Sequence, residues 1–231
     1  MGPSETAFDD NASASLPTVR TLLRALLAAC VALSPLVVAL SFVADPTGDV
    51  PHGANNIYTT FGEAGAERVE LFLFLNAAAA YLFPLSYIGM GLVALRRSPW
   101  LAALGMIAGL LGTLQWGIFV PIEALFAVMA KSPNGSDFIP LANAVSAEGV
   151  IVYFQLAWVI GHLLGFALLG VALWQARVIP RRAAALIVLG VPLQALAYPL
   201  NLGVLQIVGF LLVFVGSSPV ALALLRIIRT R

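Results

Sequence analysis

The side chains that could do chemistry in this sequence are few, and they lie inside long apolar stretches. Gln115 and Glu123 are eight residues apart in one stretch, and Gln155 and His162 are seven apart in the next. Residues at these spacings share one face of an α-helix, and Trp158 falls on the face of Gln155 and His162. Polar groups inside apolar helices bind a ligand or hydrogen-bond one another between helices.

The sequence has few residues of the types that catalyse reactions or bind cofactors. His162 lacks an obvious partner for haem, because His52 lies in a connecting loop. One cysteine, Cys30, and two histidines argue against a Cys/His zinc site. We therefore predict no catalytic residues, no metal site and no cofactor. A membrane enzyme that uses His162 with Ser217 or Glu123 stays as an alternative.

The composition requires a membrane. Of the 231 residues, 61% are apolar and 10% are charged, and the mean hydropathy is +0.97. A soluble domain is about 45–50% apolar and about 25% charged, and it could not hide this much apolar surface. A net charge of +1 argues against nucleic acid as a partner and leaves the lipid bilayer as the expected surroundings.

Six stretches are long and apolar enough to cross the membrane, so we predict an all-α polytopic bundle of six transmembrane helices. Pro199, Asn201 and Gly203 are expected to break the last two apart, and Pro121 is expected to kink the third. The predicted spans are Leu22–Ala44, Leu71–Leu95, Trp100–Ala130, Val150–Trp174, Ala183–Leu200 and Leu202–Leu225.

The basic residues predict the orientation. Most of them fall on one side of the spans, which by the positive-inside rule is the cytoplasmic side, and both termini lie there. The Arg-, Ala- and Gly-rich composition is typical of a bacterial protein of the cytoplasmic membrane. The residues on the cytoplasmic side are Arg20, Arg24, Arg96, Arg97, Arg177, Arg181, Arg182, Arg226, Arg229 and Arg231, and those on the outer side are Arg68 and Lys131.

Polar side chains are concentrated in the outer half of the predicted bundle. The inner half has no acid, amide or imidazole and keeps only hydroxyls such as Ser86 and Ser217. This asymmetry favours a polar-lined cavity open to the outside and closed within, although the same residues could serve only as hydrogen bonds between helices. The predicted ligand-binding residues are Gln115, Glu123, Gln155, Trp158, His162, Gln194 and Tyr198.

The chain divides into a polar, disordered cytoplasmic tail over 1–20 and one membrane domain over 21–231, with outer loops at 45–70 and 131–149. Similar Ala/Leu/Gly/Pro patterns suggest a repeat of the hairpins of spans two–three and four–five, and the alternative is that such spans resemble one another by composition alone. Glycines four apart in spans three and four, Gly105–Gly109 and Gly161–Gly165, favour close helix packing within the chain, and a homodimer face is the alternative.

One segment resembles a known family. It runs from Trp158 through Gly161-His162-Leu163-Leu164-Gly165 and Gly170–Trp174 to Val178-Ile179-Pro180-Arg181-Arg182. The pattern is similar to that of uncharacterised bacterial, often actinobacterial, multi-pass membrane proteins with a six- to seven-helix domain of unknown function. The resemblance implies a helical bundle in the membrane and brings no catalytic residues with it.

The sequence therefore predicts a non-enzymatic integral membrane protein that binds a lipid or small molecule in an outward-open cavity. The alternatives are a small transporter, a membrane subunit of a larger complex with a membrane protein partner, and the membrane enzyme described above.

Overall fold

The structure, a computed structural model, describes residues 7–47 and 54–229, with side chains described for 19–47 and 58–226. In these ranges the chain is helical with short connections and contains no strand, which confirms the all-α prediction. The helices are α1 (Ala7–Ala44), α2 (Ala54–Glu63), α3 (Ala66–Ala94), α4 (Pro99–Thr113), α5 (Trp116–Ala130), the short 3-10 helix η1 (Gly135–Phe138), α6 (Ile139–Ala147), α7 (Gly149–Ala176), α8 (Arg181–Leu200) and α9 (Gly203–Arg229).

Six segments of the described chain are long and apolar enough to cross a membrane, as predicted. Each agrees with its predicted span to within a few residues, because runs of about 20 apolar residues mark both. The segments are Val19–Ala44, Ala66–Ala94, Pro99–Ala130, Gly149–Ala176, Arg181–Leu200 and Gly203–Arg226. The protein is a multi-pass membrane protein.

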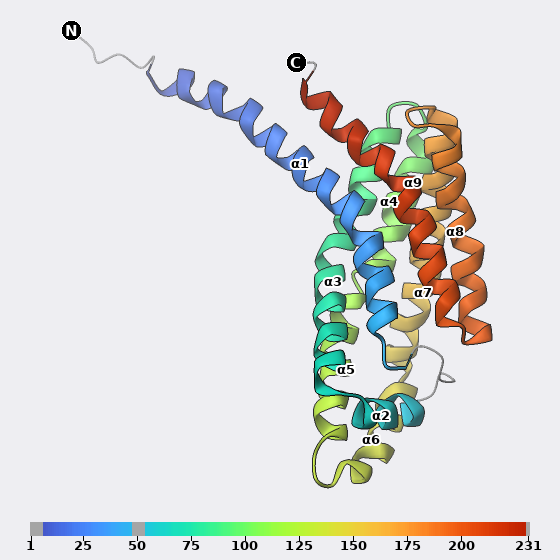
Figure 1. The fold of residues 1–231 in the computed structure, drawn as a ribbon. Helices are drawn as coiled ribbons and strands as arrows, with labels where there is room; N and C mark the ends of the chain where they lie inside the picture. The colour runs from blue at the N-terminus through green and yellow to red at the C-terminus, as the bar shows by residue number, and fades with distance from the viewer. Residues whose placement is uncertain (1–6, 48–53, 230–231) are drawn as a thin grey trace.

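The spans stand side by side, with α1 between α3 and α9, α4 against α7, and α8 against α9 (Figure 1). Aromatic rings fill their shared core, where Phe83 contacts Tyr87, Phe166 and Phe210 at centroid distances of 5.5–5.8 Å. A second, smaller apolar cluster joins α2 and α6 to α3 and α5 at one end of the bundle. That end is therefore closed by short helices rather than by open loops.

Residues 7–20, which the sequence assigns to a disordered tail, continue α1 as helix and project away from the bundle (Figure 1). A formed helix extends at little cost beyond its packed part, since each added residue gains a hydrogen bond. Disorder of this tail stays a prediction, as do the repeat of the two hairpins and the domain boundaries. The outer loop at 45–70 contains α2 and the start of α3, and His52 lies outside the described residues.

The third span breaks at Leu114–Gln115, between α4 and α5, and not at Pro121, where the sequence predicts the kink. Side chains bond to the carbonyls of the last turn of α4: the Thr113 hydroxyl donates to Gly109 O at 2.7 Å, and Gln115 Nε2 donates to Leu111 O at 2.9 Å. Such bonding back to the helix bends it. Pro121 then lies inside α5.

The turn between α8 and α9 forms where the sequence predicts it. Asn201 has a left-handed backbone with φ of 51°, and the N–H of Leu202 donates to Ala197 O at 3.2 Å. Asparagine tolerates this conformation better than most residues, so it ends α8 and lets α9 begin two residues later.

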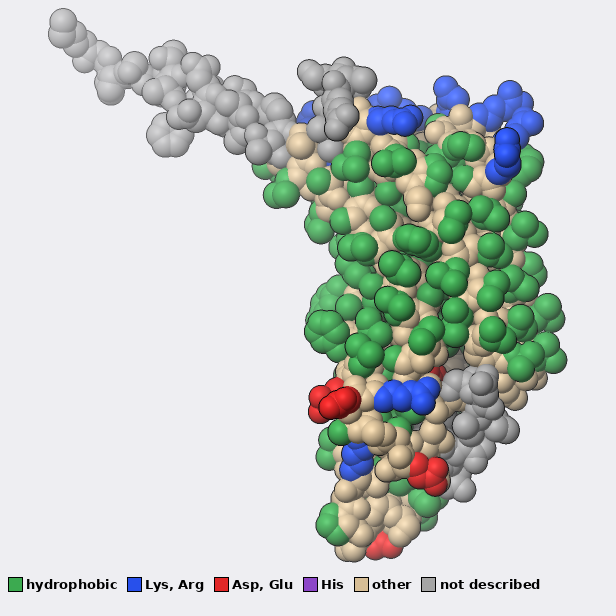
Figure 2. Space-filling view, in the orientation of Figure 1, with side chains coloured by type: hydrophobic (Ala, Val, Ile, Leu, Met, Phe, Trp, Pro, Cys, Tyr) green, Lys and Arg blue, Asp and Glu red, His purple; other side chains and the backbone are tan. Residues whose placement is uncertain are grey.

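Charge separates the two ends of the bundle. Arginines of the α3–α4 and α7–α8 connections gather at what we call the basic end, and carboxylates gather at the acidic end, which α2, η1 and α6 form (Figure 2). Arg97 Nη1 donates to Ala176 O at 2.9 Å at the basic end, and Arg68 Nε donates to Ala44 O at 3.0 Å at the acidic end. Each arginine thus caps the carbonyl end of a helix.

Cysteine labelling tests which end faces the cytoplasm. In a Cys30→Ala background, we expect an impermeant maleimide to label Asp137→Cys in intact cells and to label Arg96→Cys only after lysis, since both side chains are exposed at opposite ends of the bundle. Labelling is read by gel shift. Reaction of Arg96→Cys before lysis, with protection of Asp137→Cys, would reverse the orientation.

The glycine pairs of the third and fourth spans pack within the chain, as predicted. A Cβ on Gly161 would lie 2.6 Å from Gly112 Cα, and one on Gly165 would lie 2.7 Å from Gly109 Cα. These distances are shorter than any real contact, so the α4 and α7 backbones touch because neither has a side chain there. A homodimer face stays untested.

We expect Gly161→Ala to destabilise the bundle by about 1–3 kcal/mol, because the added methyl must push two backbones apart. The matched control is Gly117→Ala, where a Cβ meets nothing within 4 Å. Thermal unfolding of the purified proteins in one detergent measures both. An unchanged midpoint for Gly161→Ala would show that α4 and α7 do not depend on this contact.

Candidate functional site

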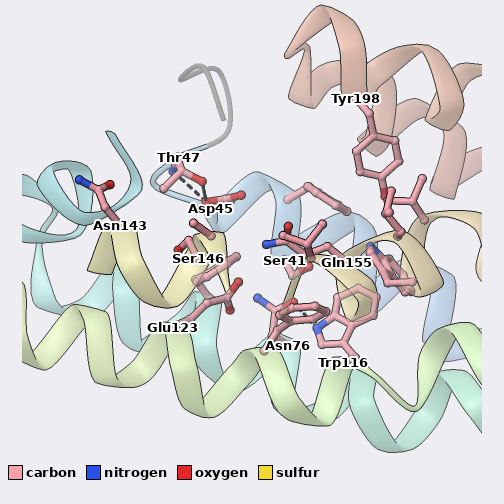
Figure 3. Close-up of a pocket in the computed structure, with 18 residues that line it drawn as sticks. Ser41, Asp45, Thr47, Asn76, Trp116, Glu123, Asn143, Ser146, Gln155 and Tyr198 are labelled. Atoms are coloured by element: carbon pink, nitrogen blue, oxygen red, sulfur yellow. Dashed lines mark hydrogen bonds between the residues drawn. The ribbon is translucent and has the colours of Figure 1, made fainter. Parts of the chain in front are cut away.

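A cavity of about 700 Å³ lies in the half of the bundle nearer the acidic end. Figure 3 shows side chains from α1, α3, α5, α6, α7 and α8 converging on it. Its lining consists of Ser41, Phe42, Asp45, Thr47, Phe72, Asn76, Trp116, Phe119, Glu123, Asn143, Ser146, Ala147, Val152, Gln155, Leu156, Trp158, Val159 and Tyr198. The wall is mostly apolar and aromatic, with a few polar groups, as in small-molecule sites.

Two carboxylates line the cavity, and they differ in their hydrogen bonds. Asp45 Oδ1 accepts from the backbone N–H and the hydroxyl of Thr47, each at 2.7 Å. Glu123 points into the space between α5 and α6 (Figure 3), and its Oε2 is buried with no hydrogen-bond partner among the described residues. A buried carboxylate oxygen without a donor is costly, so Glu123 is the group most in need of a partner.

Aromatic rings form the floor of the cavity, on the side toward the middle of the bundle. Trp116 Nε1 donates to Asn76 Oδ1 at 3.0 Å, and the ring meets Trp158 edge-on at a centroid distance of 4.3 Å. Trp158 in turn stacks on His162, with centroids 4.0 Å apart and planes 14° apart. Trp116 and Trp158 therefore form the floor, and the stacked His162 ring supports it from behind.

Buried polar atoms continue behind this floor, between α7, α8 and α9. His162 and Gln194 are 0% exposed, and His162 Nδ1 lies 2.7 Å from Trp158 O. His162 Nε2, both amide atoms of Gln194, the Tyr198 hydroxyl and Gln206 Oε1 have no hydrogen-bond partner among the described residues. Buried polar groups are nearly always satisfied, so this group suits internal water or the polar part of a ligand.

The structure divides the seven predicted ligand-binding residues into three groups. Glu123, Gln155, Trp158 and Tyr198 line the cavity. His162 and Gln194 do not line it but lie fully buried behind its floor.

Gln115 belongs to neither group, because it does not line the cavity and its amide donates to Leu111 O at 2.9 Å. The turn at Leu114–Gln115 separates it from the helix of Glu123, and the face that the spacing predicts for the two residues stays a prediction.

Several lining residues lie outside the predicted set. Asn76 could have been predicted from the sequence, since it is a polar residue in the outer half of the second span. Asn143 and Ser146 are three residues apart on α6, so they share a face, but this helix lies in a stretch that reads as a loop. Asp45 directly follows α1 and reaches the cavity through its turn with Thr47.

The proposed pairing of His162 with Ser217 is not formed. The Ser217 hydroxyl donates to Val31 O and Phe214 O, both at 3.1 Å, while His162 Nδ1 is engaged with Trp158 O. No three His, Cys, Asp or Glu side chains of the described residues lie together as metal ligands would. The site is a cavity with two carboxylates and an aromatic floor.

These features define a polytopic membrane protein with an internal cavity near one end. Comparison of the chain with known protein families, with curated proteins and with solved structures found no match. What the protein does must therefore be argued from its own residues.

The hydrogen bond between Trp116 and Asn76 is expected to hold the cavity floor. Asn76→Ala leaves the buried Trp116 N–H without its acceptor and should destabilise the protein by about 1–3 kcal/mol. Because Trp116→Phe removes the donor, the second change should cost less in the Asn76→Ala background than in the wild type. A double-mutant cycle of unfolding free energies measures this; strictly additive effects would contradict a coupled pair.

Proposed function

We propose that this protein binds an amphiphilic small molecule or a lipid in its cavity, as a non-enzymatic binding protein of the bacterial cytoplasmic membrane. With both termini in the cytoplasm, the acidic end and its cavity face the outer side. The observation that carries the proposal is the cavity itself, about 700 Å³ of space beside a buried, unpartnered oxygen of Glu123.

Size and lining both suit a ligand with an apolar body. Ligand pockets are about 300–1,000 Å³ and combine apolar walls with few polar groups. Here Phe42, Phe72 and Phe119 supply apolar surface, and Glu123 and Gln155 supply polar groups.

The basic half of the bundle supports binding over free passage. Phe83, Tyr87 and Met90 of α3 are 0% exposed there, and the Ser86 hydroxyl is satisfied by Phe83 O at 2.7 Å. Ser217 likewise bonds to backbone carbonyls. Among the described residues, packed rings and these two satisfied hydroxyls favour binding over passage, although the buried Ser34 hydroxyl of α1 has no partner.

The second candidate is a small transporter, and it rests on the unpartnered polar atoms behind the floor. Gln194 and Gln206 carry amide atoms that no described residue satisfies. If Trp158 moved, these groups would join the cavity and lead a polar ligand deeper into the bundle. Uptake into proteoliposomes of a molecule that co-purifies with the protein separates transport from binding alone.

Native mass spectrometry of the protein purified in mild detergent tests the proposal. We expect a bound molecule in the wild type that is lost or weakened in Ala147→Trp, because an indole at this lining position takes up part of the cavity. Ala144→Trp is the matched control, since Ala144 is exposed on the same helix and does not line the cavity. A wild-type protein of bare mass, or an adduct that persists in a folded Ala147→Trp, would contradict the proposal.

A further inference from the structure

We infer that the cavity selects an organic cation, a positively charged group such as an ammonium carried on an apolar body. This inference rests on the proposed function, since it names the ligand class of the same cavity. It is carried by the charges of the lining: Asp45 and Glu123 are carboxylates, and the lining holds no Lys, Arg or His among the residues that the structure describes.

Glu123 is the carboxylate that needs a cation. Asp45 is engaged with Thr47, whereas Glu123 Oε2 is buried and has no donor among the described residues. The structure places Arg68 beside Asp45, but its guanidinium donates to Ala44 O and Asp45 O and does not line the cavity. A carboxylate held away from water is stabilised by an opposite charge close to it, and the ligand can supply this charge with or without a hydrogen bond.

The rings around Glu123 suit the same ligand. Phe119 and Trp116 precede Glu123 by four and seven residues on α5, so all three share one helix face, and all three line the cavity. Trp158 continues this surface from α7, edge to face with Trp116 at 4.3 Å. Indole and phenyl faces attract cations within about 6 Å, and the attraction grows when water is excluded.

Other ligand classes fit these charges less well. An anion would enter a space lined by Asp45 and Glu123 and would meet no basic lining side chain in the described chain. A neutral ligand could hydrogen-bond to Glu123 but would make no use of a lining whose ionisable acids, Asp45 and Glu123, face no basic side chain among the described residues. The chemistry that completes the site is shared by free hydrophobic amines and by the amine of a lipid headgroup.

Two probes of one shape and opposite charge test the inference. Tetraphenylphosphonium and tetraphenylborate both carry four phenyl rings, and their binding to the purified protein can be measured by equilibrium dialysis against a micelle blank. We expect the cation to bind more tightly than the anion. We expect Glu123→Gln to weaken cation binding at least about tenfold, because the variant keeps the shape of the side chain and removes its charge.

Two control variants separate the effect of the Glu123 charge from other effects of the substitution. Glu70→Gln makes the same chemical change on an exposed side chain of α3 outside the lining, and cation affinity should stay unchanged. Glu123→Asp retains the charge and should keep more affinity than Glu123→Gln, which separates charge from folding. Equal or tighter binding of the borate, no binding of either probe, or full cation affinity in Glu123→Gln would overturn the inference.

The source of the cation is resolved with lipids. After delipidation, retention of phosphatidylethanolamine over phosphatidylglycerol by the wild type but not by Glu123→Gln assigns the site to a lipid amine. Selectivity for tetraphenylphosphonium with neither lipid retained supports a free amine, and preference for phosphatidylglycerol overturns the cation class.

The proposed function can survive the failure of this inference. A neutral or anionic molecule that co-purifies with the wild type and is lost in Ala147→Trp would leave the cavity as a binding site and refute only the charge assignment.

Discussion

The contact between the backbones of α4 and α7 determines where the cavity lies. A Cβ on Gly112 would meet the backbone N of His162 at 2.6 Å, so at this depth the two helices are as close as helices can come. Trp116 follows Gly112 by four residues, and Trp158 precedes Gly161 by three. The glycine contact therefore brings the two indoles together at 4.3 Å and sets the cavity floor just beyond the point where α4 and α7 touch.

The break at Leu114–Gln115 completes this arrangement. Because α5 starts again at Trp116, that indole is turned into the bundle, where it is 7% exposed and bonded to Asn76 on α3. The new helix carries Phe119 and Glu123 on the same face as Trp116, facing the cavity, while Gln115 is left bonded to its own helix. The break before α5 thus places Trp116 of the cavity floor and the carboxylate of Glu123 on one helix face.

The sequence predicts the spans and a few of the lining residues, such as Gln155 and Trp158, because each rests on a local signal. Apolar runs mark membrane helices, and an unbroken helix such as α7 lets spacing place Gln155, Trp158 and His162 on one face. Spacing alone could not show that Gln115 stays outside the lining, since the helix break beside it depends on side chains that bond back to particular carbonyls. It missed Asn143 and Ser146 because α6 reaches the cavity only through tertiary packing with α2 and α7.

Stability and function are divided between the two halves of the bundle. Buried polar groups without partners, such as Gln194 and His162 Nε2, each destabilise the folded protein. The surrounding lipid does not offset this, because lipid tails form no hydrogen bonds. The rings of Phe83, Tyr87, Phe166 and Phe210 and the glycine contacts of α4 with α7 supply packing that offsets this cost. The half nearer the acidic end thus holds polar groups without partners, while the other half is packed with rings. Under the proposed function, a ligand that hydrogen-bonds to these groups would add to the stability of the protein.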